Sequence, residues 1–171
     1  MEGVIFLLGG NSRKFFIILI STPINLNQTI MEMHVNMVAI LVAVVANFIL
    51  GFVWYTPLFG KAWAKEMGFD LTVKPLGGEM AKGMIFMLIG NFFMAYVFAN
   101  NQMAWSFVPG VSEMGPIMNI MNATLFTWLG FYLPVDIGIV TWEKKSWKLF
   151  FINTGYHFMM LLVAATILTI L

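Results

Sequence analysis

The chain has 171 residues, of which 60% are hydrophobic, 16% aromatic and only 10% charged, with nine basic and eight acidic residues. Soluble domains carry about 25% charged residues, so this composition excludes an ordinary water-soluble fold. The balanced charge does not indicate nucleic-acid binding, and the absence of cysteine excludes disulfides, thiolate metal sites and a thiol nucleophile.

Residues 1–32 do not fit a membrane span, because Arg13 and Lys14 divide their apolar content into two short pieces. A helix that crosses a bilayer needs about 20 mostly apolar residues, which neither piece provides. We expect residues 1–32 to be either an extra segment from a start codon assigned too early or an interfacial element. Residues 33–171 are expected to form a single domain.

Four apolar stretches follow, and each reaches or approaches the length of a spanning helix once its aromatic flanks are included. They cover residues 38–53, 83–99, 117–133 and 149–171. They lack the strict alternation of a membrane β-barrel. The sequence therefore predicts an all-α integral membrane protein, a four-transmembrane-helix up-down bundle with a short interfacial amphipathic helix after the first span.

Aromatic and proline residues after the first span form a predicted interfacial elbow. Its members are Trp54, Tyr55, Pro57, Phe59 and Trp63. Phe59 and Trp63 are four residues apart, while Lys61 and Lys65 lie on another side of the same turns, which predicts a short helix on the membrane surface. Pro57 is expected to end the first span. The elbow is expected to fix the angle between two helices, with a partner-docking surface as the alternative.

Lysines are concentrated in alternate gaps between the apolar stretches. Residues 56–82 hold four, residues 141–148 hold three and residues 100–116 hold none. Because basic loops are retained in the cytoplasm, loops 56–82 and 141–148 are predicted to be cytoplasmic, and the N- and C-termini outside. The expected location is the cell (inner) membrane, with several passes.

Two parts of the sequence carry a family resemblance. They are Asn36 to Ala43 followed by Gly51-Phe52-Val53-Trp54-Tyr55-Thr56-Pro57-Leu58-Phe59-Gly60-Lys61-Ala62-Trp63, and the run from Trp142 to His157. With these motifs, residues 36–171 resemble the family catalogued as domain of unknown function 1761. The resemblance implies a small bacterial-type membrane protein of four helices, and it implies no known activity.

Polar residues inside the predicted spans form the candidate site, because a polar group in hydrocarbon needs a partner and therefore reports the inside of a bundle. At 1.5 Å per residue they lie roughly 7 to 14 Å from the cytoplasmic boundary. This intramembrane polar layer comprises Asn47, Asn91, Asp136, Asn153 and His157. Asp136 joins it if the third helix continues through Pro134; otherwise it is interfacial and able to pair with Lys144 or Lys145.

His157 and Asp136 are the sharpest candidates, since ionisable residues inside a membrane often mark proton or ion pathways. The alternative for His157 is a structural hydrogen bond to the Asn153 carbonyl or to another helix. Joint ligation of haem or a metal by His34 and His157 is not expected, because they lie at different depths. We predict neither a metal nor a cofactor.

Motifs of zinc hydrolases, nucleotide-binding proteins, thiol oxidoreductases and serine hydrolases are absent from the sequence, so we do not expect an enzyme. The main hypothesis is a non-catalytic structural or accessory component of a homo-oligomer or a larger membrane complex. The alternative is a small transporter or channel lined by the polar layer. The expected partners are the lipid bilayer and either further copies of the chain or other membrane subunits, and no nucleic acid.

Overall fold

The computed structural model describes residues 34–70, 77–111 and 113–171, which belong to the compact unit Met33–Leu171. These residues form helices and connecting loops, without a strand among them. Four helices are long and apolar enough to cross a membrane, namely Met37–Leu58, Gly77–Ser106, Pro116–Trp142 and Trp147–Ile170. The predictions made for residues 1–32 lie outside the described residues.

The first long helix consists of α1 (Met37–Val53) and the π-helical turn η1 (Trp54–Leu58), and the short helix α2 (Gly60–Met67) follows it. The second is α3 (Gly77–Ser106). The third joins α4 (Pro116–Thr127), the π-helical turn η2 (Trp128–Tyr132) and α5 (Leu133–Trp142), and the fourth is α6 (Trp147–Ile170). The second and third helices therefore extend well beyond their apolar stretches.

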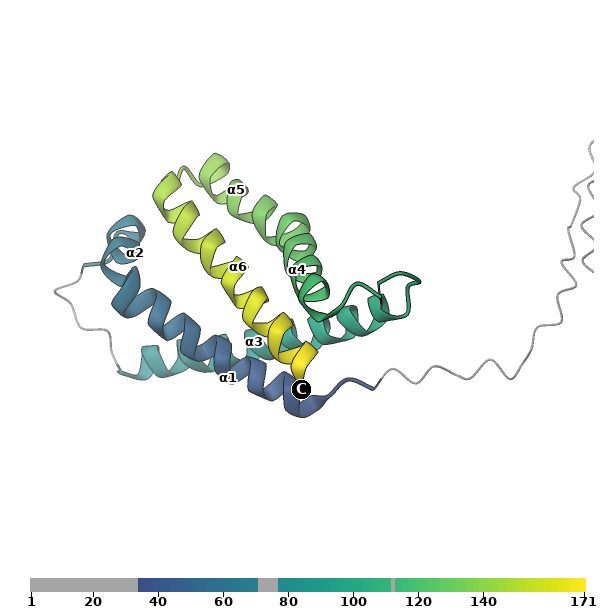
Figure 1. The fold of residues 1–171 in the computed structure, drawn as a ribbon. Coiled ribbons are helices and arrows are strands. Elements are labelled where there is room, and N and C mark those ends of the chain that lie inside the picture. The colour runs from purple at the N-terminus through teal and green to yellow at the C-terminus, as the bar shows by residue number, and fades with distance from the viewer. Residues whose placement is uncertain (1–33, 71–76, 112) are drawn as a thin grey trace, which may run out of the picture. The chain divides into compact units, whose positions relative to one another are not determined.

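Helix α6 is the central helix, because it contacts α1, α2, α3, α4, η2 and α5. Figure 1 shows it between α1 on one side and α4 with α5 on the other. A shared apolar core joins α6 to α1 and α3, and its buried members are Ile40, Ala43, Val44, Ala95, Phe98, Ala99, Leu161, Ala164 and Ala165. Five of these nine residues are alanines, which let helix backbones approach closely.

The start of α1 is tied to the end of α6 by Asn36. Its side-chain oxygen accepts hydrogen bonds from the backbone N–H groups of Val38 (2.9 Å) and Ala39 (3.2 Å), which caps α1. Its Nδ2 donates to the carbonyl of Leu171 at 3.0 Å. Helices α1 and α6 therefore run antiparallel.

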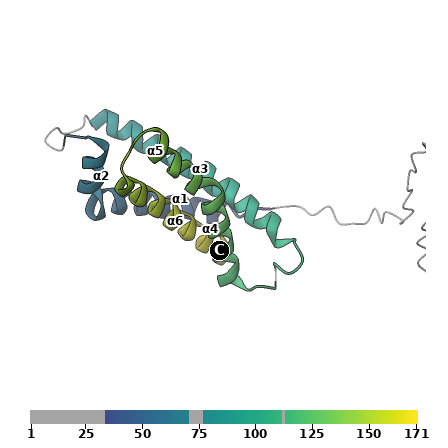
Figure 2. The ribbon, with the colours of Figure 1, turned by 90° about the horizontal axis from the view of Figure 1, so that it is seen from above.

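A second cap ties α2 to the start of α6, and Figure 2 shows these elements side by side. The Ser146 hydroxyl accepts a hydrogen bond from the Leu149 N–H at 3.1 Å and donates one to Glu66 of α2 at 2.6 Å. Lys148 lies 3.9 Å from the same carboxylate. The predicted short helix thus exists, and it is held against the bundle by polar contacts.

The first long helix does not end at Pro57, so that prediction was wrong. The turn η1 contains Pro57, and the Phe59 N–H donates to the Trp54 carbonyl at 2.9 Å, five residues back. In such a wide turn the missing proline N–H would face the carbonyl of Phe52, and the Thr56 hydroxyl donates to that carbonyl instead. The helix therefore passes the proline and ends at the following residue.

The third long helix continues through Pro134, which decides where Asp136 lies. In η2 the Leu133 N–H donates to the Trp128 carbonyl, again five residues back. Proline also deprives the Gly130 carbonyl of its usual donor, and the wide turn accommodates this without ending the helix. Asp136 consequently lies within α5 and is buried, instead of lying in an exposed loop.

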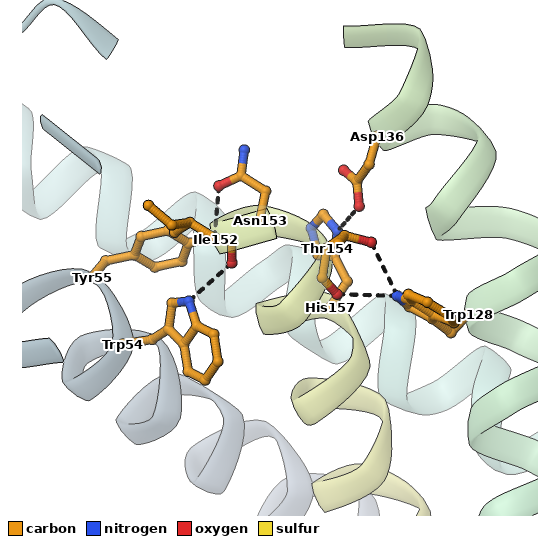
Figure 3. A network of polar contacts seen from close by, with 8 residues as sticks. All are labelled: Trp54, Tyr55, Trp128, Asp136, Ile152, Asn153, Thr154 and His157. Carbon is orange, nitrogen blue, oxygen red and sulfur yellow. Dashed lines mark hydrogen bonds and ion pairs between the residues drawn. The ribbon is translucent and has the colours of Figure 1, made fainter. Parts of the chain in front are cut away.

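Two tryptophans, each the first residue of a π-helical turn, bind α6 from its two sides (Figure 3). The Trp54 indole N–H donates to the Ile152 carbonyl at 3.0 Å. The Trp128 indole N–H donates to the Thr154 carbonyl at 3.0 Å and lies 3.2 Å from the Thr154 hydroxyl. These bonds fix the position of α6 along its axis, and its rotation about that axis, relative to the first and third long helices.

We expect Trp54→Phe and Trp128→Phe each to lower the free energy of unfolding by about 1 kcal/mol, because each removes one partly buried hydrogen-bond donor. Their effects should be nearly additive, since the two indoles bind α6 from different helices. Thermal unfolding in mild detergent measures this. Trp142→Phe is the control, because Trp142 is 86% exposed. Three indistinguishable melting temperatures would contradict the role of the indoles.

Candidate functional site

An Asp–His pair joins α5 to α6. His157 Nδ1 and Asp136 Oδ2 are 2.8 Å apart, and the side chains of His157 and Asp136 are 26% and 2% exposed. Either the imidazole N–H donates to the carboxylate or the protonated carboxyl donates to the imidazole, so a proton lies between two groups that both bind protons. The carboxyl group is therefore more completely enclosed than the imidazole.

Aromatic rings surround the imidazole of this pair. The rings of Tyr132 and Tyr156 lie with their centroids 4.8 Å and 5.8 Å from that of His157. Tyr132 comes from η2, four residues before Asp136 and thus on the same side of the helix. The two tyrosine rings therefore pack beside the imidazole that meets the carboxyl group.

Asn153 belongs to a second polar contact, between α6 and η1. The Tyr55 hydroxyl donates to Asn153 Oδ1 at 3.3 Å, and the Tyr55 ring packs on Tyr156 with centroids 5.0 Å apart. Tyr156 therefore touches both His157 and Tyr55. Figure 3 shows the two polar contacts on neighbouring parts of α6, one toward η1 and one toward α5.

Asn47 and Asn91 take no part in these contacts. Asn47 is fully buried, yet neither its amide nitrogen nor its amide oxygen has a hydrogen-bond partner among the described residues. The amide nitrogen of Asn91 and the hydroxyl of Tyr156 also have no hydrogen-bond partner among the described residues. These two residues are 5% and 4% exposed. The predicted layer thus contains two hydrogen-bonded contacts and a separate group of buried amides.

The elbow residues pack back onto the bundle. Trp54 and Phe59 have ring centroids 4.8 Å apart, and those of Tyr55 and Trp63 are 5.4 Å apart. Pro57 lies within η1. Trp54 and Tyr55 reach α6 and thereby belong to the site, while Phe59 and Trp63 support them from the side of α2.

Four site residues were not anticipated from the sequence: Tyr132, Tyr156, Trp128 and Thr154. One signal could have found the first of them, because Tyr55-Thr56-Pro57 and Tyr132-Leu133-Pro134 share the order tyrosine, any residue, proline. Each copy overlaps a π-helical turn and supplies a tyrosine that packs on α6. Such turns inside α-helices frequently occur at functional sites.

The chemistry available at this site is proton binding and hydrogen bonding. Within the described parts of the chain, no three His, Cys, Asp or Glu side chains gather closely enough to hold a metal ion. The Asp136 and His157 side chains offer two positions for a proton, and the neighbouring phenols offer hydroxyl groups. Buried ionisable pairs of this kind are costly to fold unless they are mutually bonded.

Comparison with known proteins identifies a family. The family model described as Protein of unknown function (DUF1761) matches residues 38–169, which include nearly all of the four long helices. The resemblance drawn from the sequence motifs is thereby confirmed. No curated protein and no solved structure matches the chain significantly.

A double-mutant cycle is expected to show that Asp136 and His157 stabilise one another. Asp136→Leu and His157→Leu should each lower the free energy of unfolding by about 1–3 kcal/mol, because each leaves a polar group without its partner. The double substitution should cost less than the sum by about 1 kcal/mol or more, since both partners are then apolar. Unfolding in detergent measures all three variants.

Thr166→Val is the control for this cycle, because the Thr166 hydroxyl donates only to a carbonyl of its own helix, that of Leu162. It should unfold like the wild type. Strict additivity of Asp136→Leu and His157→Leu would contradict a mutual interaction.

Proposed function

The chain belongs to the family described as Protein of unknown function (DUF1761), and from this premise we propose that it is a small four-span membrane protein that conducts protons. The observation that carries the proposal is the Asp136–His157 pair, at 2.8 Å, in which Asp136 is the buried charged residue among the described helices. The family description assigns no activity, so the proposal rests on this site.

The burial of Asp136 supports this reading. The Asp136 side chain is 2% exposed, and an apolar side chain would pack as well at this position. Moving a carboxyl group from water into the protein also costs free energy. Ionisable residues at such positions in membranes pair with one another and mark ion or proton routes. The imidazole is less enclosed than the carboxyl group, so in this proposal protons enter and leave the pair through His157.

The membrane location is supported by the four long apolar helices and by the exposed apolar side chains around them. The antiparallel pairing of α1 and α6 suits an up-down bundle in which Asn36 and Leu171 are on the same side. Lysines in the loops at the α2 end favour the cytoplasm for that side, and thus the outside for Asn36 and Leu171. The α2 helix and the tryptophans beside it are typical of the membrane–water interface.

A second candidate is a non-catalytic accessory role in a homo-oligomer or a larger membrane complex, and α3 favours it. Every residue from Gly77 to Gly90 is exposed, so none of the described helices buries this half of α3. Gly83 and Gly90 have open space where a Cβ atom would be, which suits close packing of another helix. An accessory protein needs this surface and does not need the Asp–His pair to change protonation.

The orientation has a direct test, because the native chain contains no cysteine. In intact cells, Ser106→Cys at the end of α3 should react with a membrane-impermeant thiol reagent, since we place that end outside. Lys61→Cys in α2 should react only after the cells are permeabilised. The reverse pattern would overturn the proposed orientation.

Proton conduction is tested with the purified protein in liposomes that contain a pH-sensitive dye, with a potassium diffusion potential as the driving force. We expect the wild type to acidify the lumen faster than empty liposomes. Asp136→Asn and His157→Gln should reduce this flux to the level of empty liposomes, because neither replacement binds a proton near neutral pH. Thr166→Val, whose hydroxyl bonds within its own helix, should conduct like the wild type.

Two results would contradict the proposal. A wild type no more permeable than empty liposomes would leave the accessory role as the better candidate. Full conduction by Asp136→Asn would show that protons cross elsewhere.

A further inference from the structure

Three buried polar side chains from three different helices carry atoms without hydrogen-bond partners. They are Asn47 of α1, Asn91 of α3 and Tyr156 of α6, and none is more than 5% exposed. Among the described residues nothing bonds the two amide atoms of Asn47, the amide nitrogen of Asn91 or the hydroxyl of Tyr156. A buried donor or acceptor left unpaired costs free energy, so such groups in folded proteins are normally bonded to protein, ligand or water.

These three residues lie toward the same end of the shared apolar core. On α1, Asn47 comes one turn after Ala43, and on α3, which runs in roughly the opposite direction (Figure 1), Asn91 comes one turn before Ala95. On α6, which is antiparallel to α1, Tyr156 comes just over one turn before Leu161. Ala43, Ala95 and Leu161 all belong to that core, so the three polar groups follow it in the same direction.

Tyr156 also lies close to α1 at this level. A Cβ atom built on Gly51 would be 3.1 Å from the Tyr156 hydroxyl oxygen. Gly51 is four residues after Asn47, so the two share a face of α1 and are separated by about 6 Å along the helix axis. A small molecule between the hydroxyl and the amide would therefore have a polar group on each side.

We propose that Asn47, Asn91 and Tyr156 together bind water in the centre of the bundle. The two amide nitrogens donate, the Asn47 oxygen accepts and the tyrosine hydroxyl does both, which matches a molecule that both donates and accepts hydrogen bonds. A buried water molecule typically makes about three hydrogen bonds to groups that would otherwise be unpaired. The absence of any charged side chain among the three favours a neutral molecule over an ion.

This water site would extend the polar route beyond the Asp–His pair. The Tyr156 ring lies 5.8 Å from that of His157 on one side, and its hydroxyl faces α1 on the other. Water held there would carry protons between the His157 region and the core end of the bundle. This role rests on the proposed function, whereas the binding of water does not.

Solid-state NMR of the full chain in liposomes tests the site without reference to transport. With ¹⁵N-asparagine and ¹³C-alanine labels, magnetisation passed from water should reach the side-chain amides of Asn47 and Asn91 as fast as that of exposed Asn101. The methyl groups of Ala43 and Ala95, which are 0% exposed, are the dry references and should lag behind. Asn47→Leu and Asn91→Leu assign the two amide signals.

Amides that lag like the alanine methyl groups would overturn the site, and so would alanine methyl groups that respond as fast as Asn101. Stability gives a second readout. If the site holds water, Asn47→Leu should melt no higher than the wild type. A higher melting temperature for Asn47→Leu would show a dry, unpaired amide and refute the inference.

Hydrated amides in a wild type that conducts no protons would uphold the water site and refute the proposed function alone. Dry amides in a conducting wild type would refute the water site and leave the proposed function standing. The two failures are thus distinguishable.

Discussion

The hydrogen bonding of α6 to its neighbours is the constraint on which the remaining arrangement depends. Three of its bonds to other elements use an indole N–H or a carboxyl group that an apolar interior would otherwise leave unpaired. The Trp54 and Trp128 indoles bind its backbone carbonyls, and the Asp136 carboxyl group meets its imidazole. A rotation of α6 about its axis would break all of them together. Apolar packing alone, between alanine-rich faces, would define this rotation far less sharply.

Two prolines contribute to this arrangement by widening helices without ending them. Pro57 lies in a π-helical turn and Pro134 two residues after one, and the first residue of each turn is the tryptophan that binds α6. A π-helical turn rotates the side chains that follow it about the helix axis, relative to their positions in a regular α-helix. In the third helix this brings Tyr132 and Asp136 to the side of His157. The aromatic rings and the ionisable pair are therefore products of the same local distortion.

Much of the fold could be predicted from hydropathy, because long apolar stretches leave a helix few alternatives. The lysine distribution indicated which loops are cytoplasmic, and the motif from Gly51 to Trp63 indicated the family. Both features can be read from local sequence. The course of the chain at Pro57 could not be predicted, since proline ends some helices and only widens others. That outcome depends on the Thr56 hydroxyl, which serves the carbonyl of Phe52.

The candidate site, like the fold, could be predicted from the sequence only in part. Counting residues placed Asn47, Asn91, Asn153 and His157 at one depth, but depth does not determine which side chains meet. The contact of Asp136 with His157 required the helix to pass Pro134, and the contact of Asn153 with Tyr55 required the turn η1. Trp128 and Thr154 carried no polar signal in the sequence, because tryptophan and threonine are common in apolar helices of every kind.

The central place of α6 also has a consequence for biosynthesis. It is the last of the four long helices described, and its bonds to the first long helix and to the cap of that helix join residues 98 and 135 positions apart. On a ribosome the first three long helices are made before the helix against which they pack. Contacts between such distant residues slow folding, and partly assembled helices expose surfaces that associate wrongly. The core of this protein therefore closes only when α6 arrives, which makes its arrival the decisive step of assembly.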